Sequence, residues 1–147
     1  MDNKGLIVSS DAILALIVVF ILLATVTNIS GDKSGSFIQQ VVMAKNAQDA
    51  MELMATYKNI STNKTVLELM ADQLIKNGNQ RSGMDDAGQI ASEFLDKTLS
   101  GNNYNLIEIN KLNGTPLASN ADMNNADNIS SASRTCGEYI FKLYIWD

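Results

Sequence analysis

The sequence predicts an α+β chain in which a long amino-terminal helix precedes a small head of helices and antiparallel strands. Three observations support this class. Ala12–Val26 contains no charge, proline or glycine. Apolar residues then recur at helical spacing between 37 and 99, and they partly alternate between 104 and 146. Helices followed by short strands with turn signals are typical of α+β domains.

The apolar run must be shielded from water. As a helix it spans roughly 22 Å, and the charge-free stretch that continues to Gly31 approaches the roughly 30 Å of a hydrocarbon core. Its apolarity on every side argues against an ordinary surface helix of a globular domain. A cleaved secretory signal, a transmembrane anchor and a helix that leaves the bilayer for the core of an assembly remain. The following residues, ATVTNISGD, lack an A-x-A cleavage site, which disfavours the first.

A short basic head precedes this run. The stretch KGLIVSSDAILALIVVF, about the first sixth of the chain, resembles archaeal type IV pilin-like proteins with class III signal peptides. The resemblance implies that a prepilin peptidase recognises Lys4 and Gly5 and cuts before Leu6. It also implies that Asp11 sets subunit registry by pairing with the new terminal amine of a neighbouring copy. In the family pattern the acid stands five residues after the cut, whereas here Ser10 stands there and Asp11 follows it.

The resemblance further implies the organisation and function of the chain. We expect a leader over 1–5, a long helix over 6–57 with an apolar part (12–31) and an amphipathic part (37–57), and an extracellular head over 58–147. Such a chain is inserted in the membrane before assembly, and pilus assembly machinery then builds it into an extracellular homopolymer. The alternative is a single-pass surface protein with a glycosylated ectodomain. A minor pilin-like component that primes assembly is a third possibility.

Three helical segments are expected after the apolar run. GDKSGS, residues 31–36, is interpreted as a kink or short joint. The next helix covers 37–57. Thr65-Val-Leu-Glu68 has the form of a capping box and predicts a helix over 66–75. After a loop, Asp85 and Asp86 suit the start of a helix over 87–99. The expected apolar stripe of the first of these helices consists of Phe37, Ile38, Val41, Val42, Ala44, Met51, Met54 and Tyr57.

The last third of the chain predicts an antiparallel sheet. Residues 104–112 are rich in β-forming residues, and Asn113-Gly114 indicates a type I′ hairpin turn into a strand over 115–118. Two further strands are expected over 129–136 and 138–146. Aromatic residues occur on both faces of the last strand, which indicates a strand covered on two sides.

Composition excludes several classes of function. The net charge is -5, and the 11 Lys and Arg residues are scattered, so nucleic acid is not an expected partner. The chain has no histidine and none of the common nucleotide-binding or hydrolase motifs. We therefore expect no catalytic residues, no metal, no cofactor and no enzymatic activity. Cys136, the one cysteine, is interpreted as a small buried hydrophobe, with an intersubunit bridge or a reactive thiol as alternatives.

Glycosylation sequons are frequent in this sequence and favour an external head. The candidate acceptors are Asn28, Asn59, Asn63, Asn113 and Asn128. Asn113 is the weakest of them, because Pro116 follows its Thr115.

Overall fold

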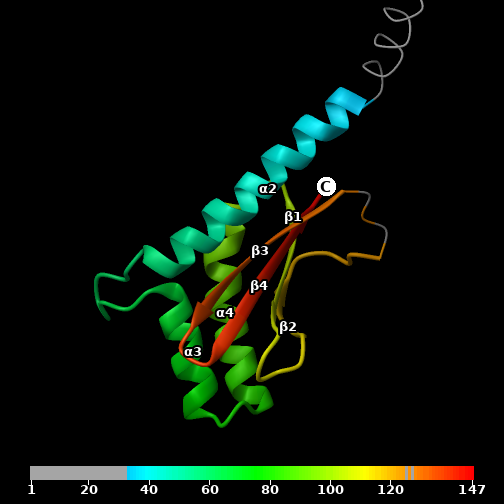
Figure 1. The fold of residues 1–147 in the computed structure, drawn as a ribbon. Coiled ribbons are helices and arrows are strands. Elements are labelled where there is room, and N and C mark those ends of the chain that lie inside the picture. Colours follow the sequence, from blue (N-terminus) through cyan, green and yellow to red (C-terminus); the bar gives the residue numbers. More distant parts are fainter. Residues whose placement is uncertain (1–32, 125, 127) are drawn as a thin grey trace, which may run out of the picture. The chain divides into compact units, whose positions relative to one another are not determined.

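The computed structural model describes residues 33–124, 126 and 128–147. The chain divides into two units, 1–39 and 40–147, and the first contributes only residues 33–39 to the described part. The predicted leader and the apolar segment up to Asp32 therefore lie outside the described residues. The described part has three helices and a four-stranded antiparallel sheet (Figure 1), which confirms an α+β head.

Helix α2 runs from Lys33 to Thr56. Residues 33–36 are helical, so the expected joint at 31–36 is not present in its described part. The buried face also differs from the expected stripe, because Val41, Val42 and Tyr57 are exposed. The buried face of α2 consists of Met43, Ala47, Ala50, Met51 and Met54. Small alanines on this face let the helix lie close to the sheet, which a search for large apolar residues does not detect.

Helices α3 (Val66–Lys76) and α4 (Arg81–Thr98) form an antiparallel pair. Thr65 and Glu68 make the predicted capping box at the start of α3. Helix α4 begins six residues before the expected position, so Asp85 and Asp86 lie inside it and not at its start. Gly83 explains the difference, because a Cβ there would lie 2.8 Å from the carbonyl oxygen of Gln73. This glycine permits close helix packing and does not end the helix.

Strands β1 (Asn103–Glu108), β2 (Thr115–Ser119), β3 (Ile129–Cys136) and β4 (Tyr139–Trp146) form the sheet in the order β2-β1-β4-β3. The β3–β4 hairpin matches the expected strands closely, and β4 is central. Strand β1 ends four residues before the expected position, and six residues connect it to β2, since Glu108 pairs with Thr115. Asn113 and Gly114 both have the positive φ expected of them, but they occupy only the end of this longer loop.

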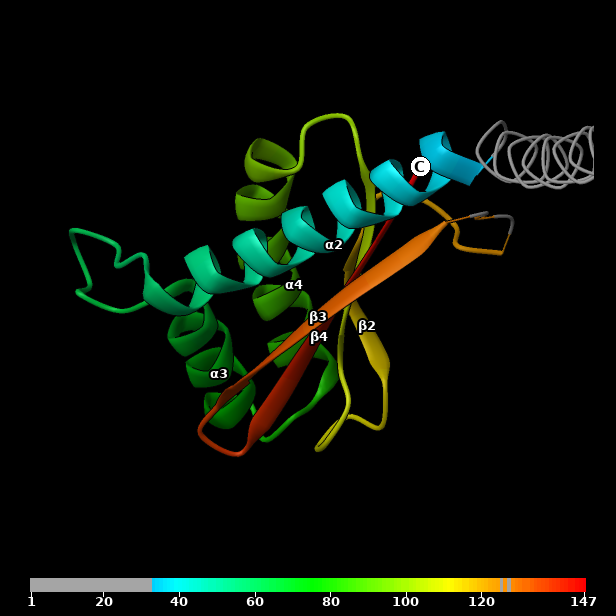
Figure 2. The same cartoon turned by 45° about the horizontal axis from the view of Figure 1, so that its top comes forward.

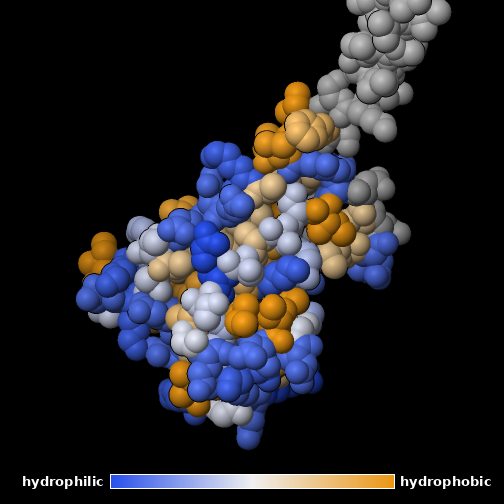
Figure 3. Space-filling model, in the orientation of Figure 1, coloured by the Kyte–Doolittle hydropathy of each residue, from blue (hydrophilic) through white to orange (hydrophobic). Residues whose placement is uncertain are grey.

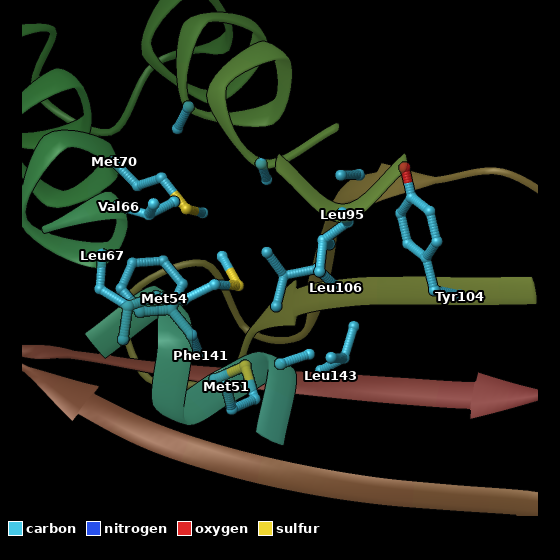
Figure 4. Packing of buried hydrophobic residues seen from close by; sticks show 14 of the residues in the cluster. Met51, Met54, Val66, Leu67, Met70, Leu95, Tyr104, Leu106, Phe141 and Leu143 are labelled. Atoms are coloured by element: carbon cyan, nitrogen blue, oxygen red, sulfur yellow. The ribbon is translucent and has the colours of Figure 1, made fainter. Parts of the chain in front are cut away.

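The core lies between the helices and one face of the sheet (Figures 1 and 2). Side chains from α2, α3 and α4 meet those of β1 and β4 there, as the close view shows (Figure 4). Helix α2 follows β3: the Gln40 carbonyl accepts a hydrogen bond from Ser130 Oγ at 3.3 Å, and Glu52 forms an ion pair with Arg134 at 3.0 Å. The opposite face of β4 is only partly covered, since Tyr144 is half-buried although Trp146 is buried.

Candidate functional site

Four residues are predicted to govern processing and subunit registry. Lys4, Gly5, Leu6 and Asp11 lie outside the described residues, as does the sequon at Asn28. Within residues 33–124, 126 and 128–147, no helix has the length and apolarity needed to span a membrane. The same part of the chain holds no cluster of three or more His, Cys, Asp or Glu side chains suited to a metal ion. The candidate sites that remain are the exposed face of α2, the sequons of the head and Cys136.

The exposed face of α2 changes character along the helix. At its beginning, Val41 and Val42 are each 51% exposed, and Phe37 and Ile38 are exposed too. From Lys45 onward the exposed positions are polar apart from Leu53, which is 44% exposed, and Lys45 pairs with Asp49 at 2.8 Å. Figure 3 shows hydrophobic side chains gathered over the first described turns of α2. Large apolar side chains in consecutive exposed turns are typical of a surface that another molecule covers.

Three of the four described sequons use their Ser or Thr hydroxyl inside the fold. In the Asn63 sequon the hydroxyl belongs to Thr65, the N-cap residue of α3. Thr65 is buried, and its Oγ1 accepts a hydrogen bond from the backbone of that helix. For Asn113 it is Thr115, whose Oγ1 donates to the Leu112 carbonyl at 2.5 Å. A transferase that must contact these hydroxyls would have to compete with the fold.

Asn128 is also engaged. Its Oδ1 accepts a hydrogen bond from Gln40 Nε2 at 3.2 Å, and the hydroxyl of its sequon, on Ser130, donates to the Gln40 carbonyl. Ser130 is buried. This sequon therefore joins β3 to α2 in the folded head.

Asn59 is different. It lies with Asn63 on the loop that connects α2 to α3, and its Oδ1 accepts a hydrogen bond from Ser61 N at 2.8 Å. Among the described residues, neither Asn59 Nδ2 nor Ser61 Oγ has a hydrogen-bond partner. Ile60 between them is 96% exposed. Of the sequons that the structure describes, the Asn59 sequon is the one in which both the acceptor amide nitrogen and the hydroxyl are exposed and not used by the fold.

Asn59 also lines a groove of about 520 Å³ between α3 and α4. The groove has two aromatic side chains, Tyr57 and Phe94, and the aliphatic side chains of Leu69 and Ile90. Glu93 and Lys97 stand among its polar lining residues. A groove with aromatic surfaces and polar groups of both signs suits a ligand that is itself part apolar and part polar.

Cys136 lies at the end of β3, half-buried against the core and lining a second groove of about 430 Å³ beside α3. Burial raises the pKa of its thiol, and the carboxylates of Glu68 and Asp72 raise it further. The thiolate, which is the nucleophilic form, is therefore scarce at neutral pH. This environment favours the packing role over the reactive thiol.

Sequence reasoning missed Glu108, a fully buried carboxylate at the end of β1. Its Oε1 accepts hydrogen bonds from the backbone of Asn110 and Ile140 at 2.9 and 2.8 Å, and its Oε2 from Lys111 and Leu112 at 2.7 Å each. The signal was present, since Glu108 follows Tyr104 and Leu106 on the inward face of the strand. The role is structural, because every acceptor atom faces the protein's own backbone.

No family model, no curated protein and no solved structure matches this chain.

Proposed function

We propose that the chain is a structural subunit of an extracellular, type IV pilus-like filament, assembled through its amino-terminal apolar helix. A prepilin peptidase removes residues 1–5, and the freed helix then exchanges lipid for copies of itself. Before assembly the chain is held in the membrane by the same segment. The proposal includes no enzymatic activity, cofactor or nucleic acid.

The observation that carries the proposal is the exposed apolar beginning of α2. This section follows the apolar run after ten residues, 27–36, and Val41 and Val42 stay half exposed although α2 packs its other face into the core. Neighbouring copies in a filament core would cover them, at about 25 cal/mol per Å² of apolar area removed from water. When each copy contacts the next head to tail, and the rotation between copies does not close a ring, the result is an open helical polymer.

Two pairs of substitutions on α2 test this. Val41→Glu with Val42→Glu should reduce the yield of sheared surface filaments by at least about tenfold, since burying two carboxylates costs well over the 1.4 kcal/mol that a tenfold change requires. The matched control, Gln48→Glu with Leu53→Glu, adds the same charge at exposed positions farther along α2. We expect it to assemble. Electron microscopy and quantitative blotting of sheared fractions measure both, and equal yields from the two variants would contradict the proposal.

The alternative, a single-pass surface protein, makes a different forecast for the same variants. If the chain does not assemble, the two double variants should be present in the membrane fraction in equal amounts. Wild-type cells should then yield no sheared polymer.

A further inference from the structure

The loop between α2 and α3 has a fixed shape. Asn59 N donates to the Lys64 carbonyl at 2.9 Å, Asn63 N donates to the Asn59 carbonyl at 2.8 Å, and Lys58 pairs with Thr65 as an isolated bridge. These bonds hold Ile60 at 96% exposure. A free loop could turn an isoleucine inward, so a loop held in this form keeps its outer edge available to another molecule.

We propose that Asn59 is the glycosylated asparagine of the head, and that the first sugars attached to it lie in the groove between α3 and α4. The inference deepens the proposed function, because it rests on the extracellular location of the head. It commits to a covalently attached oligosaccharide as the occupant of the groove. Asn59 itself lines the groove, so the glycan would begin at its wall.

The attachment is a substitution at the anomeric carbon of the first sugar. Asn59 Nδ2 attacks this carbon in a polyisoprenyl-phosphate-linked oligosaccharide, the new C–N bond replaces the C–O bond to the lipid phosphate, the phosphate leaves with the electron pair, and Nδ2 loses a proton. A membrane-bound oligosaccharyltransferase catalyses it. The hydrogen bond from Ser61 N to Asn59 Oδ1 turns the amide so that Nδ2 is the unbonded atom.

The groove fits sugar chemistry. Its volume, about 520 Å³, is within the roughly 300–1,000 Å³ typical of small-molecule sites. The rings of Tyr57 and Phe94 offer flat apolar surfaces for the C–H faces of a sugar, and Glu93 and Lys97 offer hydrogen-bonding groups for its hydroxyls. Tyr57 is 58% exposed without a cover. A glycan seated here would shield this aromatic and the half-buried Leu69 and Ile90.

Mass spectrometry of peptides from the protein purified from its own host tests the attachment. We expect a glycan on Asn59, complete loss of its mass in Asn59→Gln and in Ser61→Ala, and full retention in the matched control Asn63→Gln, which changes the same loop. A glycan mass that survives Asn59→Gln, or that Asn63→Gln removes, would overturn the assignment. So would an unmodified Asn59.

Hydrogen exchange tests the position of the glycan. Amides of α3 and α4 along the groove should exchange severalfold more slowly in the glycosylated wild type than in Ser61→Ala. Tyr57→Ala should keep the glycan mass and lose this protection, while Tyr144→Ala, on the far face of the sheet, should keep both. Equal exchange rates in the wild type and in Ser61→Ala would contradict the placement of the glycan in the groove.

Filaments built from chains with unmodified Asn59 would refute only this inference, whereas glycosylated Asn59 without filaments would refute only the proposed function.

Discussion

At the scale of single residues, two buried polar groups decide how the head is held together. Glu108 gives the β1–β2 loop its form through four backbone hydrogen bonds, and through Ile140 it ties this loop to the start of β4. Tyr104 is 1% exposed, and its hydroxyl donates to Asp96 Oδ1 at 2.7 Å, which joins β1 to α4.

Glu108→Gln should destabilise the head by about 3 kcal/mol, because an amide NH₂ would replace an oxygen that accepts two backbone N–H groups and leave them buried without an acceptor. Glu138→Gln is the control, since that carboxylate is exposed and only pairs with Lys111 at the surface. Its cost should stay under about 1 kcal/mol. Urea unfolding of the second unit, residues 40–147, measures both, and equal costs would show that the four hydrogen bonds contribute little.

Tyr104 predicts a loss of stability at alkaline pH. Burial, and then the hydrogen bond to Asp96, raise the pKa of Tyr104 from 10.0 to about 12. The unfolded chain therefore loses this proton first, so the contribution is complete below pH 10 and falls as pH rises toward 12. The difference in pKa corresponds to about 3 kcal/mol.

Tyr104→Phe removes this dependence. Between pH 9 and pH 11.5, the midpoint of urea unfolding should fall less in Tyr104→Phe than in the wild type, because no phenol remains to ionise. Tyr57→Phe, at an exposed position, should behave as the wild type does. Parallel curves for Tyr104→Phe and the wild type would mean that this phenol does not drive the alkaline loss.

At the scale of elements, close backbone contacts set the arrangement of helices on the sheet. Gly88 of α4 lies against β2, where a Cβ would stand 2.2 Å from the Leu117 carbonyl oxygen. Gly83 plays the same part between α4 and α3. Helix α4 can lie this close to β2 and to α3 only because these two positions lack side chains.

Gly88→Ala should therefore destabilise the head by about 2 kcal/mol, although glycine to alanine inside a helix ordinarily stabilises by about 0.5–1 kcal/mol. The atom in the way is backbone, so it cannot move aside as a flexible side chain could. Ser82→Ala, at an exposed position of the same helix, should cost little. Thermal unfolding compares them, and a more stable Gly88→Ala would show that α4 and β2 are farther apart than described.

A feature could be predicted from the sequence when the residues that determine it are close together in the chain. Local signals were reliable: the Thr65–Glu68 capping box, the positive φ of Asn113 and the β3–β4 hairpin are as expected. The predicted start of α4 was wrong, because Gly83 acts through a contact with α3. The predicted end of β1 was wrong, because the charged Glu108 is buried and bonds the backbone of the following residues and of Ile140. The exposed apolar beginning of α2 also escaped prediction, since periodicity indicates apolar faces and not which face is covered. The processing residues remain a prediction.

At the scale of the whole molecule, the described part of the chain folds around its own core, whereas the apolar segment before it is expected to pack against copies of itself. The α+β head buries α2, α3 and α4 against the sheet without using Val41 or Val42. The most apolar part of the chain, Ala12–Val26, lies outside the described residues. In the filament that we propose, polymerisation gives this segment a function and covers the exposed turns of α2 as well.

The amino terminus of the polymer tests this account most directly. Filaments sheared from the cell surface should consist of this chain, and mass spectrometry of the intact subunit should show that it begins at Leu6. Recovery of the protein only as dispersed, membrane-embedded chains that still begin at Met1 would contradict it.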